Sequence, residues 1–440
     1  MPQLEQETPI EVTERAPQWS LPALVAVRFG FCYLILFLYP SFLGGRPANA
    51  HPQTNLAHRI WEAVVPWVGE RILHLQGSLT PIYNGSGDQL YDYVQWFCIV
   101  VIAVLAAAIW SFLDRNRKEY EALHEWLRII VRLTVAVCMI IYGMAKLFRF
   151  QFPELPLAKL VDTYGQSSPQ GLLWAFMEYS HGYSLAGGLG ELAGGILLLV
   201  PRFTALGALI SLGMTANVLM LNVFYDVPRK ILCINLILMC LFLLWQDMRR
   251  LADFFLLNRT VQLTPPRPLF RDKGMNTVAL LCQFALGIAA LAYYANHYNA
   301  SAGDQAARVE APLRGIWNVA EFDFDGVPRL PLLTDKERWQ RVIFDRPKLF
   351  IVQLMDGTQQ SFYVQSDPES RTFSLWGGDN FQSKGKLTAE EVQPNQMVLE
   401  GQMNGHSLTL HLQRADLSDQ SKFWLINHDF RFVSPSPLLR

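Results

Sequence analysis

Charged side chains are scarce in this 440-residue chain: they make up 17% of it, whereas apolar side chains make up 51%. A typical soluble domain carries about 25% charged residues, so the composition excludes an ordinary soluble enzyme, and it also excludes intrinsic disorder. The 37 basic and 38 acidic residues leave a net charge of −1 and form no block of one sign. We therefore expect no nucleic-acid partner. The apolar excess lies almost entirely before residue 300.

Cysteine is also sparse, and the usual signatures of catalysis are missing. All six cysteines fall within apolar runs, where we interpret them as small buried residues: Cys32, Cys98, Cys138, Cys233, Cys240 and Cys282. His406 and His411 are five positions apart in one predicted strand and so face opposite sides, which argues against a shared metal ion. No catalytic triad spacing, phosphate-binding loop, haem, flavin or iron–sulfur signature occurs, so we expect no metal and no evident cofactor.

Long apolar runs are what the chain has in excess. A helix needs about 20 apolar residues to cross a hydrocarbon layer about 30 Å thick. We place seven spans near 21–43, 93–113, 129–149, 183–201, 203–224, 229–246 and 275–296. The sequence thus predicts a polytopic α-helical membrane bundle, preceded by a disordered tail over residues 1–20.

The orientation follows from the loops that carry Lys and Arg, since such loops stay in the cytoplasm. Two loops are rich in basic residues, one with Arg115, Arg117, Lys118 and Arg128, and one over residues 249–273. Seven spans then place the N-terminus in the cytoplasm and everything after about residue 297 outside. Pro47-Ala48-Asn49-Ala50 resembles a signal-peptide cleavage site, but the acidic tail and the long first apolar run favour a membrane span.

Several segments between the spans have recognisable patterns. Residues 60–75 carry apolar side chains at near-helical spacing and predict an interfacial helix, with Trp61 and Trp67 at headgroup depth. Residues 150–182 are too short and too rich in proline to span, and we expect a re-entrant or interfacial cap. Residues 249–273 form the basic cytoplasmic loop, which its prolines keep extended.

The pattern changes after about residue 312, where apolar residues alternate in short runs bounded by turn residues. Asp356-Gly357 and Asn404-Gly405 are strong hairpin signals. Candidate strands are 315–324, 338–346, 349–356, 360–366, 371–377, 382–388, 396–403, 406–414 and 423–433. These strands predict an all-β, up-and-down barrel or strongly curled sheet.

The first candidate strand begins with Gly315-Ile316-Trp317, and Arg431 lies in the last. This arrangement resembles the G-x-W start of lipocalin-like barrels. In such barrels a tryptophan closes the floor and a basic side chain of the final strand packs over it. We therefore expect Trp317 and Arg431 to close the barrel, through a cation–π contact worth about 0.5–2 kcal/mol.

Glu191 is the clearest candidate for a functional residue, because an ionisable group within a span costs roughly 2.5–3.5 kcal/mol and needs a reason to remain. Small residues surround it in the sequence and predict close helix packing: Gly143 in the third span, and Gly187, Gly190, Gly194 and Gly195 in the fourth. We expect an ion pair between Glu191 and either Lys146 or Arg28, with Asn217 and Asn222 as hydrogen-bond donors nearby. Such a pair either only fixes helix packing or forms a polar site for a quinone, a lipid or a proton.

The residues around Glu191 also carry a family resemblance. Part of the sequence resembles the four-helix core of the DoxX family of integral membrane proteins. The residues that carry the resemblance are Arg132, Tyr142-Gly143-Met144-Ala145-Lys146, Gly190-Glu191-Leu192-Ala193-Gly194-Gly195 and Arg202. The resemblance covers about 130–248. It implies a bacterial inner-membrane protein in which Gly143, Lys146, Glu191, Gly194 and Gly195 matter. The founding members are subunits of a thiosulfate:quinone oxidoreductase, although nothing in this chain matches a thiosulfate site.

The predicted order of domains sets the context for function. It runs from the first two spans (21–129) through the DoxX-like core (130–248), the basic loop (249–273), the last span (274–298) and a linker (299–312) to the β domain (313–440). One hypothesis is an accessory protein that binds a lipid or another small molecule. The alternative is a membrane subunit of a quinone-linked oxidoreductase, with quinone as its cofactor. The partners we expect are membrane lipids and a membrane or periplasmic subunit.

Overall fold

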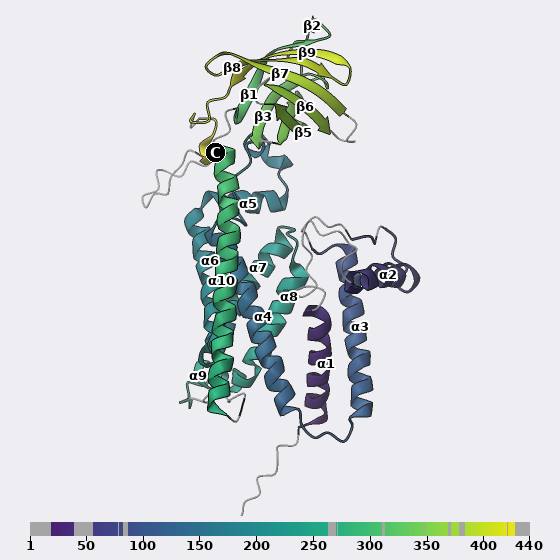
Figure 1. Cartoon of the computed structure of the whole chain (residues 1–440), viewed down its shortest axis with the longest axis vertical. Coiled ribbons are helices and arrows are strands. Elements are labelled where there is room, and N and C mark those ends of the chain that lie inside the picture. The colour runs from purple at the N-terminus through teal and green to yellow at the C-terminus, as the bar shows by residue number, and fades with distance from the viewer. Residues whose placement is uncertain are drawn as a thin grey trace, which may run out of the picture. The chain divides into compact units, whose positions relative to one another are not determined.

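The structure is a computed structural model (Figure 1). It describes residues 19–38, 56–77, 79–81, 87–262, 270, 272–309, 313–346, 348–367, 371–377, 383–419 and 421–426. The chain divides into two units. One comprises residues 1–136 and 194–284, and the other comprises residues 137–193 and 285–440. The suggested cleavage site at 47–50 lies outside the described residues.

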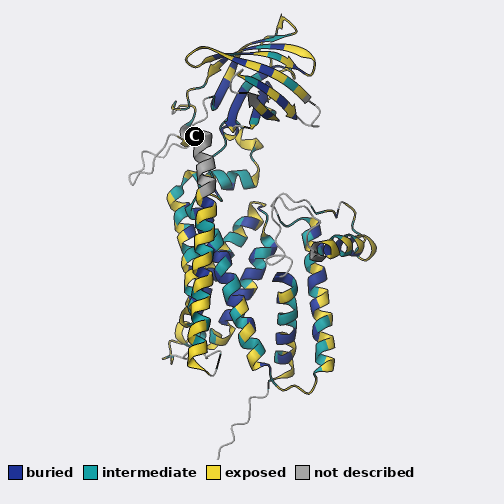
Figure 2. Cartoon of the chain, viewed as in Figure 1, coloured by how far each residue is buried: buried dark blue, intermediate teal, exposed yellow. Residues whose placement is uncertain are grey.

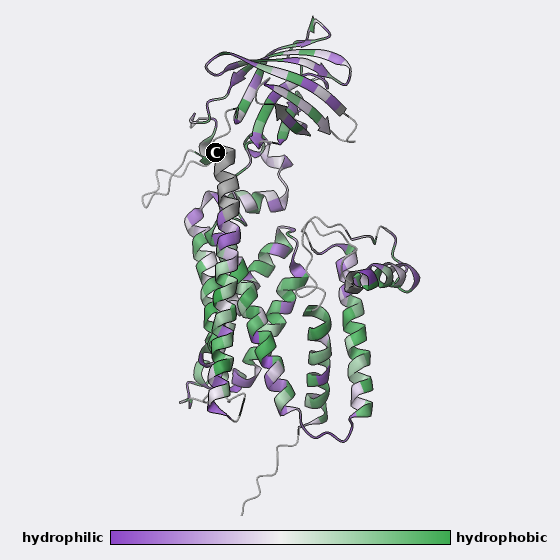
Figure 3. Ribbon diagram, viewed as in Figure 1, coloured by the Kyte–Doolittle hydropathy of each residue, from purple (hydrophilic) through white to green (hydrophobic). Residues whose placement is uncertain are grey.

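Long apolar helices dominate the first part of the chain (Figure 3). The helices are α1 (Leu21–Leu38), α2 (Leu56–Arg71), α3 (Leu90–Leu113), α4 (Glu121–Leu147), α5 (Pro169–Tyr179), α6 (His181–Leu199), α7 (Thr204–Phe224), α8 (Lys230–Leu244), α9 (Met248–Phe255) and α10 (Lys273–Val309). Short 3₁₀ turns η2 (Leu157–Leu160), η3 (Tyr164–Gln166), η4 (Pro201–Phe203) and η5 (Trp245–Asp247) connect several of them.

Seven of the helical segments in the described part of the chain are long and apolar enough to cross a membrane. They are 21–38, 90–113, 121–147, 181–199, 201–224, 230–255 and 273–299, which confirms the predicted membrane bundle. The helices α2 and α5 have 16 and 11 residues and are not among these segments. In α2, Trp61 is buried whereas Trp67 is exposed.

Two of the predicted connections contain more helix than the sequence indicated. Part of the basic segment 249–273 is helical, because α9 continues from η5 over Met248–Phe255; the prolines at 265, 266 and 268 lie outside the described residues. The proposed linker 299–312 is mostly helix, since α10 continues to Val309. The hydropathy falls in this stretch, but its alanines have a high helix propensity. They are Ala300, Ala302, Ala306 and Ala307.

The β domain is a closed antiparallel barrel (Figure 1). Its strands are β1 (Gly315–Phe324), β2 (Val327–Pro328), β3 (Trp339–Arg346), β4 (Leu349–Leu354), β5 (Gln359–Asp367), β6 (Thr372–Gly377), β7 (Ser383–Gln393), β8 (Gln396–Met403) and β9 (His406–Arg414). β1 pairs with β3, the strands from β3 to β9 pair in chain order, and β1 also pairs with β9, which closes eight strands. β2 is a short addition that pairs with β1. Asn404 and Gly405 both have positive φ, as the tight β8–β9 turn requires.

The barrel interior is a continuous hydrophobic core. Along its strands, buried and exposed positions alternate in colour in Figure 2. Strand alternation explains this, because every second side chain points inward. The core includes Trp317, Phe322, Trp339, Phe344, Phe350, Phe362, Phe373, Leu387, Leu399 and Leu410. The interior is therefore filled by the side chains of the barrel itself.

The predicted closure of the barrel can be followed at Trp317, whose cationic neighbour among the described residues is Arg414. Trp317 is buried and donates its indole N–H to the Leu313 carbonyl at 3.1 Å. The guanidinium of Arg414, in β9, lies 5.6 Å from the Trp317 ring centroid. Arg431 lies outside the described residues. The predicted strand 423–433 was wrong where it can be examined, since Trp424–Ile426 form a 3₁₀ turn, and β9 is the strand that closes the barrel.

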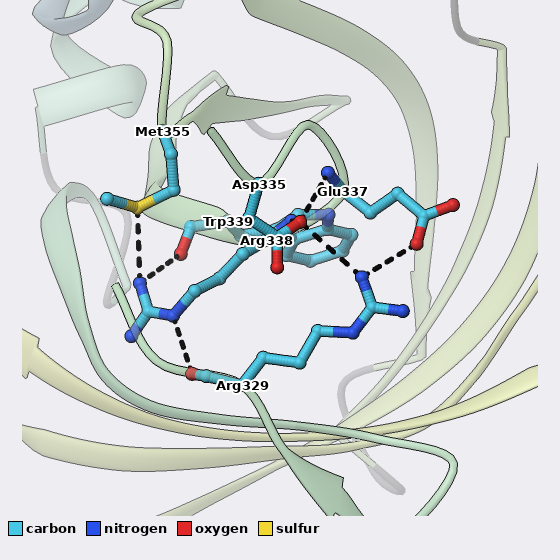
Figure 4. A network of polar contacts seen from close by, with 6 residues as sticks. All are labelled: Arg329, Asp335, Glu337, Arg338, Trp339 and Met355. Carbon is cyan, nitrogen blue, oxygen red and sulfur yellow. Dashed lines mark hydrogen bonds and ion pairs between the residues drawn. The ribbon is translucent and has the colours of Figure 1, made fainter. Parts of the chain in front are cut away.

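A loop over residues 329–338 covers the other end of the barrel (Figure 4). Arg338 is 2% exposed and donates to the carbonyls of Arg329 (2.9 Å) and Trp339 (3.2 Å). Asp335 accepts from the backbone N–H groups of Glu337 and Arg338, and Arg329 pairs with Glu337 at 2.7 Å. A buried guanidinium bonded to backbone carbonyls thus ties the loop to the barrel.

A short segment after α4, residues 157–162, packs on the outside of the barrel. Leu157 and Ala158 join a cluster with Ile316, Ile343 and Ile351, which point outward from β1, β3 and β4. Gln359 donates to the Ala158 carbonyl at 2.9 Å, and Gln353 donates to the Val161 carbonyl at 3.2 Å. Part of the segment predicted as an interfacial cap is therefore a docking segment for the barrel.

Candidate functional site: a buried ion pair

Lys146 and Glu191 form a buried ion pair between two membrane-length helices. Lys146 lies in the last turn of α4 and Glu191 in the middle of α6. The Lys146 Nζ atom lies 2.6 Å from Glu191 Oε2 and 2.8 Å from Oε1. The two side chains are 6% and 5% exposed. Because the surroundings have a low dielectric constant, each charge needs a compensating partner. The contact of the ammonium with both carboxylate oxygens provides it.

Glycines bring the two helices together at this pair. A Cβ atom on Gly143 would lie 2.8 Å from the carbonyl oxygen of Gly188 and 2.9 Å from the backbone nitrogen of Leu192. A Cβ atom on Gly188 would lie 2.9 Å from the Cβ of Lys146. Because no side chain separates the backbones, Lys146 lies directly beside the turn of α6 that carries Glu191.

The other predicted packing glycines divide between different contacts. A Cβ atom on Gly187 would lie 4.0 Å from the Cδ atom of Lys146, an ordinary van der Waals distance. Gly194 packs against α7, where its Cβ would lie 2.6 Å from the Ser211 hydroxyl. Gly195 is buried and Gly190 is half-buried. The sequence pattern identified a close-packing face but did not single out Gly188, which makes the tightest contact with Gly143.

Arg28, the second predicted partner, makes a different set of contacts. Its Nε atom donates to the Tyr120 hydroxyl at 3.1 Å, and its Nη2 atom donates to the Asp114 carbonyl at 2.8 Å. The guanidinium also lies 5.0 Å from the centroid of the Tyr120 ring. Arg28 therefore ties α1 to the connection between α3 and α4.

The two asparagines predicted near the site have different surroundings. Asn222 is buried in α7 and its side-chain nitrogen lies 3.4 Å from the Cys233 sulfur. Asn217 is exposed on α7, so it is not the buried donor that the sequence suggested. The helical period explains the difference, because the two positions are five residues apart and lie on different sides of α7.

Polar groups also gather where α4 ends and α6 begins. Arg149 follows α4 with a positive φ and donates from Nε to His181 Nδ1 at 3.1 Å. Burial raises the pKa of Glu178, near the end of α5, above its ordinary value. The charge of Arg149 opposes this shift, and the charge of Glu154 adds to it. Ionisable residues of three neighbouring segments thus gather one helical turn or more from the ion pair: the end of α4, α5 and the start of α6.

Sequence reasoning missed three polar contacts among the helices. The Asp88 carboxylate accepts from the backbone N–H groups of Lys230 and Ile231 and so caps α8 from 142 residues away. Tyr33 in α1 accepts from Trp96 in α3 at 2.8 Å and donates to Asn235 in α8. Arg132 in α4 donates to Gln283 in α10. Single polar residues within apolar runs indicated that such contacts exist. The sequence did not identify their partners, because these are distant along the chain.

The described cysteines and histidines were compared with the arrangement that a metal ion requires. All six cysteines are free. Over the described ranges, no three His, Cys, Asp or Glu residues are placed to hold a metal ion. His406 contacts Asp325 at 2.7 Å and His411 lies 3.7 Å from Glu321, so each is engaged with its own carboxylate.

In the described part of the chain, seven membrane-length helices followed by a closed eight-stranded barrel define a multi-pass membrane protein with an additional β-barrel domain. Over 143 residues the chain is 34% identical to "Uncharacterized protein YwoB" of Bacillus subtilis (strain 168), a match that covers 32% of this chain and 91% of YwoB. The chain therefore belongs to the same family as YwoB. No family model matches the sequence, and no solved structure matches it.

Proposed function

We propose that this chain is a DoxX-like protein of the bacterial inner membrane in which Lys146 and Glu191 bind the polar end of a lipid-soluble small molecule. The observation that carries the proposal is the buried pair itself. Both groups lie in membrane-length helices, where unpaired charges are costly and ionisable residues usually mark a site. Lys146 supplies N–H donors and Glu191 supplies carboxylate acceptors, so the pair can contact a carbonyl, a phosphate or a hydroxyl group.

The β domain has a different role in this proposal. Its interior is filled by its own core, so the barrel offers a ligand or partner its outer surface. The docking segment 157–162 begins eleven residues after Lys146 and holds the barrel on the stretch of chain that leaves α4. We propose that the barrel lies on the periplasmic side and that the N-terminus lies in the cytoplasm.

Identification of co-purified small molecules tests the proposed binding site. The full chain is purified from membranes in a mild detergent, and its bound molecules are extracted and identified by mass spectrometry. We expect a phospholipid, a fatty acid or a quinone at a fixed ratio to protein. A quinone favours the alternative function, a membrane subunit of a quinone-linked oxidoreductase of the thiosulfate:quinone type. A purified, folded protein without any bound molecule contradicts both functions.

A double variant separates binding from helix packing. Lys146→Met together with Glu191→Met removes both charges and keeps side chains of similar length, and such replacements of buried pairs are often tolerated. We expect this variant to remain folded and membrane-inserted but to lose the bound molecule. Retention of the molecule at the wild-type ratio would assign the pair to packing alone. Asn217→Ala, at an exposed site on α7, is the control.

Cysteine labelling in intact cells tests the orientation. Glu390→Cys lies on an exposed position of β7, and Arg115→Cys lies on the exposed connection after α3. We expect a membrane-impermeant reagent to label Glu390→Cys from outside and to label Arg115→Cys only after lysis. The exposed native Cys282 is replaced in both backgrounds. The reverse labelling pattern would overturn the proposed orientation without touching the binding proposal.

A further inference from the structure

Part of the outer face of the barrel lies away from the docking segment. The docking segment contacts residues of β1, β3 and β4 and the start of β5. Farther around the barrel, Tyr363 of β5 and Trp376 of β6 point outward from directly paired positions. They are 51% and 42% exposed. Their rings lie 21° from parallel with centroids 6.3 Å apart.

Basic residues continue this aromatic pair on the next strand. Lys384 of β7 is paired with Trp376, and Lys386 is paired with Ser374, two residues before Trp376. Both lysines are exposed, and neither forms an ion pair with a carboxylate in the described part of the chain. Because neighbouring strands are about 4.8 Å apart, the two rings and the Lys384 stem lie in one continuous row.

Hydrogen-bonding side chains surround this row. Exposed residues that point outward beside the rings and lysines are Ser361, Gln365, Ser374, Thr388 and Gln402, with Glu400 beyond Thr388 at the edge. The sector therefore combines aromatic surface, hydroxyl and amide groups and two positive charges, and it is bordered by one carboxylate. An acyl chain or an apolar helix would need a larger continuous apolar surface than two rings provide.

We infer that this face binds an acidic glycan chain through Tyr363, Trp376, Lys384 and Lys386. A pyranose ring has an apolar C–H face that can lie on an aromatic ring, and its rim of hydroxyl groups matches the surrounding Ser, Thr and Gln side chains. Carboxylates on such a chain pair with the two lysines. The inference rests on the proposed placement of the barrel outside the cytoplasm, where surface glycans lie.

A packing role for the aromatic pair makes a different prediction. Cross-strand aromatic pairs stabilise a sheet by roughly 0.2–1 kcal/mol even without a ligand. A pair with this role alone would affect thermal stability but not binding, and the charge of the neighbouring lysines would be immaterial. Binding and stability are therefore measured on the same variants.

The test is isothermal titration of the full chain in detergent with tetragalacturonate, using maltotetraose as the neutral control. We expect saturable binding of the acidic oligomer, with affinity at least ~10-fold higher than for maltotetraose and lower at high salt. Trp376→Ala and Tyr363→Thr should each weaken binding ~10-fold or more, whereas Trp376→Phe should retain most of it. Lys384→Gln with Lys386→Gln should remove the preference for the acidic oligomer, and Lys336→Gln, on the loop at one end of the barrel, should not.

Several outcomes would overturn the inference. They are no binding of tetragalacturonate by the wild-type protein, equal binding by folded Tyr363→Thr and lysine variants, or binding only of phosphatidylglycerol vesicles. The last result would assign the face to a lipid surface instead. Because titration uses purified protein, its result is independent of the cysteine labelling. Failure of glycan binding is thus distinguishable from failure of the proposed orientation.

Discussion

The Lys146 ammonium contacts both carboxylate oxygens of Glu191, at 2.6 and 2.8 Å, although the two residues are 45 positions apart. The contact joins α4 to α6, and α5 lies between them in the sequence. The two side chains are 6% and 5% exposed. Separation of α4 from α6 would therefore leave two buried charges without partners.

Removal of one partner should be more harmful than removal of both. Lys146→Met leaves the Glu191 carboxylate buried without a counter-charge, so we expect a loss of about 3–5 kcal/mol in the free energy of unfolding. The double variant Lys146→Met, Glu191→Met should be close to wild type. Denaturant titration of the purified protein in mixed micelles measures both. Equal losses in the single and double variants would show that the two side chains are not energetically coupled.

A methyl group at the helix crossing should disturb the same site. Gly143→Ala places a Cβ atom 2.8 Å from a backbone carbonyl of α6, which cannot move without separating the helices. We expect destabilisation of about 1–3 kcal/mol. Gly213→Ala, where nothing lies within 4 Å, is the matched control and should leave the unfolding free energy unchanged or slightly higher. Similar behaviour of the two variants in a thermal melt would argue against the close approach.

Closure of the barrel should depend on Trp317 and, more weakly, on Arg414. Trp317→Ala removes a buried core side chain, and we expect a loss of about 3–5 kcal/mol. Arg414→Gln removes the cation above the ring, which should cost about 0.5–2 kcal/mol. Hydrogen exchange of β1 and β9 peptides in the full chain measures local opening. Unchanged protection of β1 in Trp317→Ala would contradict its role.

Acid should loosen the loop that closes the opposite end of the barrel. The backbone N–H of Glu337, with that of Arg338 and the Arg329 guanidinium, holds the pKa of Asp335 below its ordinary value. The stabilisation is therefore present above the ordinary pKa of aspartate and is lost as the pH falls through the lower, folded-state value. We expect faster hydrogen exchange of residues 329–338 below about pH 4. Asp335→Asn should exchange faster already at pH 7 and respond less to acid.

Much of the architecture could be predicted because its signals are local. The runs that became α1, α3, α4, α6, α7, α8 and α10 have the length and apolarity that a membrane requires. Alternation and turn residues placed β1 and β3 to β9 within a few residues. Residues 424–426 belong to a segment that alternates in the same way, but they form a 3₁₀ turn, and β1 closes the barrel by pairing with β9. Closure is a property of the whole sheet, which no local pattern reports.

The sequence by itself determined which charged residues would be buried at a high free-energy cost, because hydropathy and helical period depend only on residues close together in the chain. Glu191, Lys146 and Arg28 were identified in this way, since their neighbours are apolar. Only the tertiary structure decided between the partners. It placed Lys146 on Glu191 through the glycine contact of α4 with α6, and it placed Arg28 on Tyr120 and Asp114. The physical reason is that charge pairing acts over a few ångströms in space, and helix packing sets that distance.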